Sequence, residues 1–381
     1  MRVAVLGGGP AGAFTAERLA AGGANTVLID EKLAWEKPCG GGLTYKAYQT
    51  YPFLVDNATP KRFVTETTLA APKAREVHLK LDHALVIYSR KELNGMFLAR
   101  AASAGAQIEK TRVTAMERTG AGWRISTTAG AINVDRCVIA MGARNPLRQV
   151  GTQLTSADTM SAMGYYVAGE QAGIDIQFLP ELAGYIWVFP RCGHMSVGIC
   201  GKGEPAGSLR KRLEKYMDER GLKFKGAEFY SHLLPCLETA AWKTNRVAGD
   251  DWTAVGDAAG LVDPITGEGL YYALRSADLA AQTILQDNGP KAADTYRQLL
   301  RKDFMHDLEF GSRLARRIYY GSFLFGSVPT RMVQFTRRSQ TFKAAVQDLF
   351  AGTQSYIGLK RRLLRNLNGS LLEVASSPLR R

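Results

Sequence analysis

The start of the chain has the hydrophobic pattern of a strand, a helix and a second strand. Residues 3–6 form a continuous apolar run, a glycine-rich turn follows, a helical stretch covers 11–21, and a second apolar run covers 26–29. Continuous apolar runs of this length are typical of strands buried on both faces of a parallel sheet. The pattern therefore predicts the opening unit of a doubly wound fold.

The middle of the chain follows a different pattern. Between about 160 and 245, short strand-like segments alternate apolar and polar residues, as in an antiparallel sheet. A buried strand at 252–255 and a helix from about 268 to 286 come next, and the chain after 290 is mostly helical.

These patterns predict an α/β fold: a Rossmann-like cofactor-binding domain with an inserted antiparallel-sheet substrate domain and a helical C-terminal region. At 381 residues the chain exceeds the size at which one hydrophobic core stops growing, so two lobes are expected. The expected boundaries are 1–159 with 246–290 for the discontinuous Rossmann-like domain, 160–245 for the substrate domain, and 291–381 for the C-terminal region.

The first turn carries a dinucleotide-binding pattern. Gly7 permits a tight turn, Gly9 lets the backbone approach a pyrophosphate, and Gly12 lets the helix pack closely on the sheet. Asp30 ends the next strand, where a carboxylate can accept hydrogen bonds from ribose hydroxyls and disfavours a 2′-phosphate. The predicted contacts of this half-site are Gly7, Gly9, Pro10, Ala11, Gly12, Asp30 and Glu31.

A second glycine-rich segment follows the strand at 252–255. Its Gly256-Asp257 pair resembles the ribityl-binding segment of p-hydroxybenzoate hydroxylase-like flavoproteins, which implies FAD as the cofactor. The resemblance implies that Asp257 accepts a hydrogen bond from a ribityl hydroxyl, and that the turn before the next helix faces the flavin pyrimidine. The alternative is an aspartate that only caps a helix. The predicted contacts here are Gly256, Asp257, Pro264, Gly267 and Gly269.

Arg90 lies where a predicted strand meets a predicted helix, and the residues after it resemble the superfamily's Arg-x-x-Leu-Asp stretch. The resemblance implies a contact between Arg90 and FAD. Taken alone, an arginine at such a junction is more often a surface residue.

Two further segments resemble the geranylgeranyl reductase family. Residues 37–43 read Lys-Pro-Cys-Gly-Gly-Gly-Leu, like the family's Cys-Gly-Gly loop, and 185–190 read Tyr-Ile-Trp-Val-Phe-Pro, like its YxWxFP motif. A glycine loop lets backbone approach a planar ring, and an aromatic strand can line a cavity for a long apolar ligand. The resemblance implies catalytic-loop residues Cys39, Gly40 and Gly41, and substrate contacts Tyr185, Trp187 and Phe189.

The resemblance implies reduction of carbon–carbon double bonds in a prenyl lipid or prenylated quinone, with hydride from reduced FAD and a proton from Cys39 or a bound water. Two alternatives stay open: a flavin-dependent monooxygenase or halogenase acting on an aromatic substrate, and a non-catalytic flavoprotein that docks a partner. Residues 140–142 read Ala-Met-Gly where relatives commonly carry Ala-Asp-Gly, which weakens a transfer of function from the hydroxylases. Since the sequence has no second GxGxxG, the electron donor is expected to be transiently docked NAD(P)H or a redox protein.

The net charge of +14 is concentrated in the last quarter of the chain. Residues 291–381 hold 17 Lys or Arg and 6 Asp or Glu, so peripheral contact with an anionic membrane is one expectation and a solvated basic face the other. The segment 356–367 has the pattern of an interfacial amphipathic helix or of a helix packed on its own domain. We do not expect nucleic acid as a partner.

The five cysteines are scattered and have no metal-ligand spacing, so reduced thiols and no structural metal are expected. The N-terminus has no signal-peptide pattern, and no apolar run reaches the length of a membrane span. A cytoplasmic protein, or one peripheral to the membrane, is therefore expected.

Overall fold

The computed structural model describes residues 1–362 except 121, 148–149, 287–290 and 360. The chain divides into two compact units, each formed by three separate segments. Unit 1 comprises Met1–Lys37, Arg90–Thr159 and Leu233–Glu309; unit 2 comprises Pro38–Ser89, Met160–His232 and the chain from Phe310 onward. Half of the expected amphipathic segment 356–367 lies outside the described residues.

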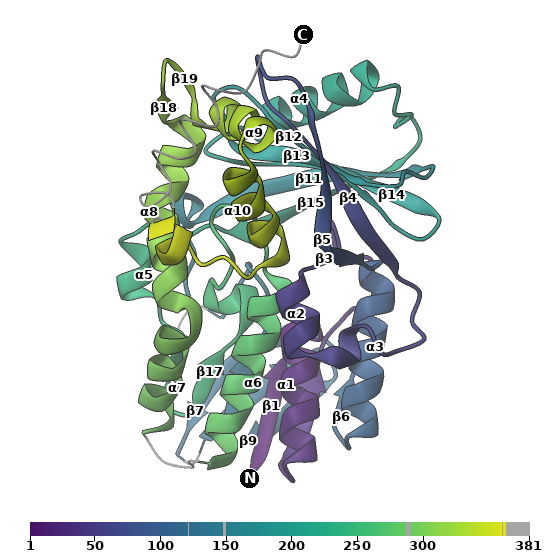
Figure 1. Cartoon of the computed structure of the whole chain (residues 1–381). Helices are drawn as coiled ribbons and strands as arrows, with labels where there is room; N and C mark the ends of the chain where they lie inside the picture. Colours follow the sequence, from purple (N-terminus) through teal and green to yellow (C-terminus); the bar gives the residue numbers. More distant parts are fainter. Residues whose placement is uncertain (121, 148–149, 287–290, 360, 363–381) are drawn as a thin grey trace. The chain divides into compact units, whose positions relative to one another are not determined.

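Unit 1 is built on a six-stranded sheet, shown in Figure 1. β1 pairs in parallel with β2 on one side and with β10 on the other, and β6 and β17 extend the parallel sheet outward. In sheet order the strands are β16 (Ala248–Gly249), β17 (Trp252–Ala254), β10 (Arg136–Ile139), β1 (Arg2–Leu6), β2 (Asn25–Ile29) and β6 (Gln107–Glu109). Strands β1 and β10 are almost entirely buried, as their continuous apolar runs predict.

Helices cover the unit 1 sheet. Helix α1 (Pro10–Ala21) packs against α3 (Arg90–Ser103) and α6 (Leu270–Gln286), and α6 packs against α7 (Ala292–Leu300). A separate antiparallel sheet contains β7 (Val113–Thr119), β8 (Gly122–Thr127) and β9 (Gly130–Val134). The remaining helical elements are η2 (Ser156–Asp158), α5 (Ala241–Thr244), η3 (Gly256–Ala259), η4 (Arg301–Met305) and the start of α8 (His306–Tyr320).

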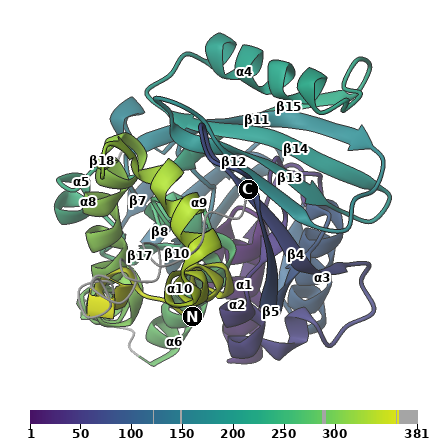
Figure 2. The same ribbon diagram turned by 45° about the horizontal axis from the view of Figure 1, so that its top comes forward.

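Unit 2 is built on an eight-stranded, mostly antiparallel sheet, one face of which is covered by α4 (Ala206–Glu219), as Figure 2 shows. The strands in sheet order are β15 (Glu228–Pro235), β11 (Thr159–Ala168), β14 (His194–Lys202), β13 (Ala183–Pro190), β12 (Ile174–Phe178), β4 (Arg62–Ala70), β5 (Val77–Ile87) and β3 (Gly42–Leu43). Its other elements are α2 (Tyr45–Thr50), η1 (Pro52–Leu54), α9 (Val328–Arg338), α10 (Gln340–Ala351) and the hairpin strands β18 (Ser322–Phe323) and β19 (Gly326–Ser327).

The predicted fold class is confirmed, with a parallel Rossmann-like sheet, an antiparallel sheet and C-terminal helices. The two units divide the chain differently from the expected boundaries: residues 233–245 lie in unit 1, and the described residues from Phe310 onward lie in unit 2 rather than in a separate C-terminal region. Residues 38–89 belong to unit 2, because β4 pairs with β5 and, in parallel, with β12. Residues 291–309 belong to unit 1, where the buried Tyr296 hydroxyl donates a hydrogen bond to the Ala254 carbonyl at 2.9 Å. Among the described helices, none combines the length and apolarity that a bilayer span requires.

Candidate functional site

The first half of the candidate cofactor site lies at the carboxyl end of β1. The chain runs from β1 outward to β2 and β6 and later returns to β10 on the other side, so the strand order reverses between β1 and β10. Open parallel sheets bind ligands at the carboxyl ends of their strands at such a reversal. The Gly7 turn is fixed there by a 2.8 Å hydrogen bond from its N–H to the Ile29 carbonyl.

The three glycines of the first motif have different surroundings. Gly7 has φ +113°, and a Cβ there would lie 2.3 Å from the Ala140 oxygen. A Cβ on Gly12 would lie 1.9 Å from the Gly7 oxygen. By contrast, no atom lies within 4 Å of the Cβ position of Gly9. The fold itself requires the first and third glycines, whereas the second faces open space that a ligand can enter.

The N-terminus of α1 opens beside Gly9. Pro10 occupies the first turn, the Gly9 cap makes no side-chain hydrogen bond, and the first turn has no acidic residue. The first N–H groups of a helix have no intrahelical acceptor and carry a partial positive charge, which favours a phosphate group.

The two acidic residues after β2, Asp30 and Glu31, have different partners. Asp30 Oδ2 accepts from the Gly8 N–H at 2.7 Å, and its Oδ1 accepts from the N–H groups of Lys32 and Leu33 at 2.7 and 2.6 Å. The Glu31 carboxylate forms an exposed ion pair with Arg112 at 2.5 Å. Asp30 therefore holds the glycine turn against the end of β2; a contact of either carboxylate with ribose stays a prediction.

The second glycine motif meets the first within unit 1. A Cβ on Gly256 would lie 3.0 Å from the Ala11 Cβ, and the Gly256 N–H donates to Ser276 Oγ at 3.0 Å. The Asp257 carboxylate forms a 3.1 Å ion pair with Lys37, and both side chains are largely buried. Two segments far apart in the sequence thus converge at the first turn of α1, as the two-part prediction requires.

The turn that leads into α6 is held by two acidic residues. The buried Asp263 accepts hydrogen bonds from the N–H groups of Ile265 and Thr266 at 2.8 and 2.9 Å. Glu268 accepts from the Tyr271 N–H at 2.7 Å and so caps α6. Gly267 has φ +70°, which favours glycine, and a Cβ on Gly269 would lie 3.5 Å from the Asp257 carboxylate. Pro264 lies within the same turn.

Arg90 begins α3 and is only 3% exposed, contrary to the usual position of an arginine at a strand–helix junction. Its backbone N–H donates to Glu36 Oε1 at 2.8 Å, and its Nη2 donates to Asn94 Oδ1 at 3.3 Å. Among the described residues, nothing accepts a hydrogen bond from its buried Nε. Since burying an unpaired polar group is costly, Arg90 Nε fits a role in binding a polar ligand.

In unit 2 the Cys-Gly-Gly loop packs on the aromatic strand. Added Cβ atoms on Gly40 and Gly42 would lie 3.2 and 2.9 Å from the Phe189 ring. One on Gly41, where φ is +85°, would lie 2.1 Å from the backbone carbonyl oxygen of Tyr88. Gly41 is therefore required by its positive φ and by the backbone beside it, whereas a Cβ on Gly40 or Gly42 would press on the Phe189 ring, which would have to shift. The two segments that carried the family resemblance therefore pack against each other.

The Cys-Gly-Gly loop is held in place by a buried polar cluster formed by Arg191, Ser196 and Tyr230. The fully buried Arg191 guanidinium donates to the Cys39 carbonyl through Nη2 and to the Gly40 carbonyl through Nε at 3.4 Å. Ser196 Oγ also donates to the Cys39 carbonyl at 3.0 Å and is bonded to the Tyr230 hydroxyl at 2.8 Å. Burial raises the pKa of Tyr230 well above its ordinary value, so this hydroxyl stays protonated.

The three aromatic residues of β13 lie on one face of the sheet. Side chains alternate along a strand, so Tyr185, Trp187 and Phe189 share a face, whereas Ile186 and Val188 enter the core beneath α4. The rings of Tyr185 and Trp187 meet edge to face with centroids 6.2 Å apart. The half-buried Cys39 accepts the Gly41 N–H on its Sγ at 3.3 Å.

Comparisons with known proteins show which proteins this chain is similar to. The family model of pyridine nucleotide-disulphide oxidoreductases matches residues 1–161. The chain is 28% identical to the chloroplastic geranylgeranyl diphosphate reductase of Arabidopsis thaliana, over 77% of this chain and 68% of that protein. It is also 28% identical to digeranylgeranylglycerophospholipid reductase 1 of Methanosphaera stadtmanae, over 76% of this chain and 77% of that protein.

The chain is a distant homologue of the geranylgeranyl reductases. It is an FAD-dependent oxidoreductase of the geranylgeranyl reductase-like type. A solved structure described as a geranylgeranyl bacteriochlorophyll reductase-like protein from Thermoplasma acidophilum has the same fold, with a TM-score of 0.78 and 20% identity over 98% of both chains.

Several residues of this reductase-like protein's site escaped prediction. Lys37 and Glu36 lie in a loop whose polar composition gave no sign that their partners would be Asp257 and the start of α3. Asp263 had a detectable signal, because an aspartate before a proline often begins a turn bonded to its own side chain. Arg191 follows the YxWxFP motif, and a charged residue there would ordinarily be assigned to the surface.

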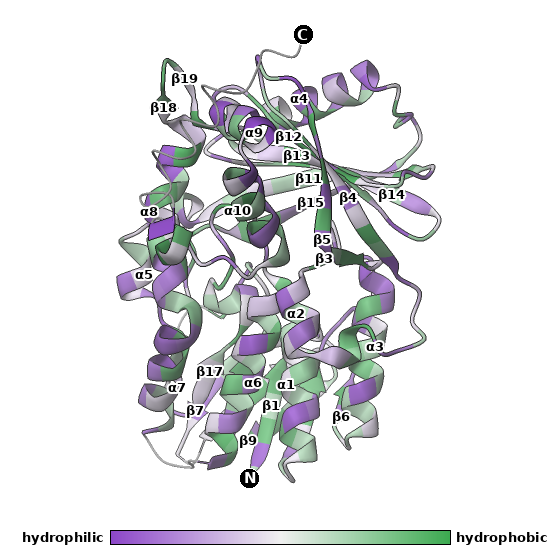
Figure 3. Ribbon diagram, in the orientation of Figure 1, coloured by the Kyte–Doolittle hydropathy of each residue, from purple (hydrophilic) through white to green (hydrophobic). Residues whose placement is uncertain are grey.

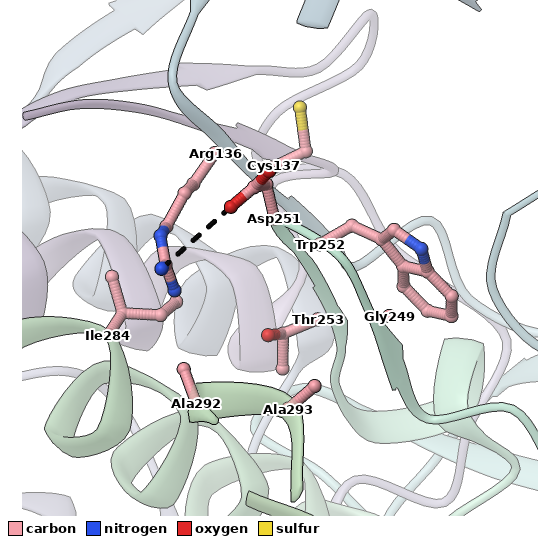
Figure 4. A pocket seen from close by; sticks show the side chains of 9 residues that line it. All are labelled: Arg136, Cys137, Gly249, Asp251, Trp252, Thr253, Ile284, Ala292 and Ala293. Atoms are coloured by element: carbon pink, nitrogen blue, oxygen red, sulfur yellow. Dashed lines mark ion pairs between the residues drawn. The ribbon is translucent and has the colours of Figure 1, made fainter. Parts of the chain in front are cut away.

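A small pocket at the amino-terminal ends of strands β10 and β17 in unit 1 does not belong to this site. Figure 4 shows it beside the ion pair of Arg136 with Asp251, at 3.8 Å, where β10 and β17 begin. Ligands of parallel sheets bind at the other ends of the strands. Burial raises the pKa of Cys137 in its lining well above the usual range, so this thiol is unreactive.

Arg90 offers a prediction on cofactor binding. Replacing Arg90 by Met should leave the apoprotein's stability within about 1 kcal/mol of the wild type, because the change removes a buried Nε that has no described acceptor. FAD affinity should fall about tenfold to a hundredfold, as expected on losing a charge-assisted hydrogen bond. Flavin titration and denaturant unfolding measure the two effects. Strong destabilisation with unchanged FAD affinity would make Arg90 a structural residue.

Proposed function

We propose that this protein reduces carbon–carbon double bonds in the prenyl chain of a lipid or prenylated quinone. The observation that carries the proposal is the packing of Gly40 and Gly42 on Phe189, which joins the Cys-Gly-Gly loop to the aromatic face of β13. The names of the two relatives support it, since one is a geranylgeranyl diphosphate reductase and the other a digeranylgeranylglycerophospholipid reductase.

In this proposal unit 1 binds FAD. The open space at Gly9 and the N-terminus of α1 receive the pyrophosphate, Asp30 and Glu31 serve the ribose, and Asp257 and Arg90 bind farther along the cofactor. The proposed FAD contacts are Gly7, Gly9, Pro10, Ala11, Gly12, Asp30, Glu31, Arg90, Gly256, Asp257, Pro264, Gly267 and Gly269. Reduced FAD supplies a hydride from N5.

Unit 2 supplies the substrate surface and the proton. Tyr185, Trp187 and Phe189 present apolar rings to the prenyl chain, where each methylene removed from water contributes about 0.8 kcal/mol. The Cys39 thiol donates its proton to the carbon that does not receive the hydride, and solvent then reprotonates the thiolate. Gly40 and Gly41 let backbone approach a planar ring.

The electron donor is proposed to be NAD(P)H or a redox protein, because the sequence provides no second dinucleotide fingerprint. The five cysteines form no disulfide bond, and we propose a reducing compartment, the cytoplasm, for the protein. A lipid substrate would bring the protein to a membrane as a peripheral enzyme.

An anaerobic assay tests this function. The FAD-loaded protein is chemically reduced and mixed with geranylgeranyl lipids, and product mass and flavin absorbance are followed together. We expect a gain of two hydrogens per flavin oxidised. No change in lipid mass, with rapid reoxidation and a peroxyflavin spectrum when air is admitted, would instead support the oxygen-using alternative.

Cys39 has its own prediction. Replacing Cys39 by Ala should lower kcat by about a hundredfold, as expected on loss of a general acid. FAD content and the rate at which the flavin is reduced should not change. Replacing Cys192, the exposed cysteine, by Ala is the matched control and should leave kcat unaltered. Full activity of Cys39→Ala would assign the proton to water.

A further inference from the structure

The short hairpin between α8 and α9 in unit 2 has an unusual tip. β18 and β19 pair Ser322 with Ser327 and Phe323 with Gly326, which leaves Leu324 and Phe325 as the two central turn residues. Both have positive φ, 47° for Leu324 and 59° for Phe325. Two-residue hairpin turns with positive φ at both positions strongly prefer Asn and Gly, since bulky side chains are strained there.

The tip displays its apolar side chains to solvent. Phe325 is fully exposed, with a relative accessibility of 106%, and Leu324 is 48% exposed. Phe323 and Tyr320, next to the turn, are also exposed, at 40% and 55%, and Figure 3 colours the ribbon at the turn between β18 and β19 as hydrophobic. Clustered exposed aromatic and aliphatic side chains on a soluble surface indicate an interaction site.

The strained conformation is actively held. Arg331, in the first turn of α9, donates to the carbonyl of Phe323 through Nε at 3.3 Å and to that of Leu324 through Nη2. A Cβ on Gly326 would lie 2.7 Å from the Arg331 Nε, so glycine makes room for this guanidinium. The Phe323 ring packs edge to face on Phe335 of α9. The hairpin is therefore a preorganised support for two exposed apolar side chains.

The chain on both sides of the hairpin carries only positive charge. Residues 310–347 contain six arginines and one lysine and no Asp or Glu. Arg316 and Arg317 are exposed in the last turns of α8, directly before the hairpin, and Arg337 is exposed at the end of α9. An apolar tip flanked by cations is complementary to a bilayer surface with anionic headgroups, where the side chains enter the acyl boundary and the cations meet the phosphates.

We propose that the hairpin Ser322–Ser327 is a membrane-docking element that inserts Leu324 and Phe325 into an anionic lipid bilayer. Under the prenyl-lipid function proposed above, docking would bring the protein to a bilayer that holds its substrate. Docking does not depend on that function, because binding to vesicles requires neither flavin reduction nor turnover. A failure of the reductase assay therefore does not contradict the docking proposal. A failure of vesicle binding likewise does not contradict the proposed reductase function.

The test is cosedimentation of the full-length, FAD-loaded protein with vesicles of phosphatidylcholine alone or mixed with phosphatidylglycerol. The wild type should bind the anionic vesicles and bind them more weakly at high salt. The double variant Leu324→Asn with Phe325→Gly removes both side chains and gives the turn its preferred residues, so its thermal stability should be equal to or above that of the wild type. Its vesicle affinity should fall at least about tenfold.

Two further variants separate the contributions. Arg316→Gln with Arg317→Gln should lower affinity for anionic vesicles by about fivefold to tenfold per charge and leave binding to phosphatidylcholine unchanged. Phe63→Ser, which removes an exposed phenylalanine on β4 outside the hairpin, is the matched control and should bind like the wild type. The proposal would be overturned if the wild type did not bind anionic vesicles, or if the hairpin variant bound them with wild-type affinity. A wild-type dimer that becomes monomeric in the hairpin variant would also overturn it, because the tip would then contact a second copy of the chain.

Discussion

Replacing Gly9 by Ala should weaken FAD binding without harming the apoprotein, whereas replacing Gly12 by Ala should destabilise unit 1 itself. The Cβ of an alanine at position 12 would lie 1.9 Å from a backbone oxygen, so α1 would have to move away from the end of β1. We expect a loss of about 3 kcal/mol or more in unfolding free energy, as for other severe overpacking changes.

Gly9 is different because its backbone already has φ −70° and its Cβ position faces open space. Alanine adopts this conformation easily and reduces the freedom of the unfolded chain, so the apoprotein should gain about 0.5 kcal/mol. The added methyl would occupy the space proposed for the pyrophosphate, so FAD affinity should fall about tenfold to a hundredfold.

Denaturant unfolding of the apoprotein and fluorescence titration with FAD distinguish the two glycines. Gly207→Ala, in α4 of unit 2, also adds a methyl where no atom lies within 4 Å and serves as the control. It should match Gly9→Ala in stability and the wild type in FAD affinity. If Gly9→Ala binds FAD as tightly as the wild type, the pyrophosphate does not approach this glycine.

The backbone of the first half-site, a strand, a glycine turn, a helix and a second strand, could be predicted because its signals are local, while its contacts with FAD stay a prediction. Glycine spacing, an apolar strand and an amphipathic helix lie within the first 30 residues, and the observed β1, α1 and β2 follow them closely. The two glycine motifs also converge as expected, at Ala11 and Gly256. Such predictions succeed because backbone conformation and close approach are dictated at each glycine by its immediate neighbours.

The assignment of residues 38–89 was wrong because strand patterns do not specify a partner. β5 alternates buried and exposed residues along much of its length, and that alternation would be the same in either sheet. Its place in unit 2 depends on β4, which pairs in parallel with β12 about a hundred residues later in the chain. Long-range register is set by packing of whole faces, which a single sequence does not display.

The polar support of the site was also beyond local reasoning. Among the described residues, the Arg90 side chain is bonded only to Asn94 on its own helix, and Glu36 accepts from its backbone N–H, so its burial has no local sequence signal. Arg191 is an arginine that composition assigns to the surface, yet it is buried because it donates to carbonyl groups of a loop more than a hundred residues earlier. Tertiary structure alone reveals this kind of residue.

Arg191 leads to the second large expected effect. Replacing Arg191 by Met should reduce kcat at least about tenfold, because the Cys39 and Gly40 carbonyls lose their buried donor and the loop loses its fixed position. The Gly40 carbonyl loses its described donor, which costs about 1–3 kcal/mol, whereas the Cys39 carbonyl keeps the Ser196 hydroxyl, so the variant should also be less stable by about 1–3 kcal/mol. Arg191→Lys should recover part of both losses, since one ammonium group cannot reproduce the fork of a guanidinium.

The rate at which iodoacetamide alkylates Cys39 separates positioning from general instability. It should rise in Arg191→Met, measured well below the unfolding temperature and with Cys192 already replaced by Ala, because the released loop exposes its thiol. Ser196→Ala, which removes only one of the two described donors to the Cys39 carbonyl, should cost about 1 kcal/mol and have a smaller effect on alkylation. If Arg191→Met alkylates and turns over like the wild type while unfolding more easily, Arg191 stabilises unit 2 but does not position the Cys39 loop for catalysis.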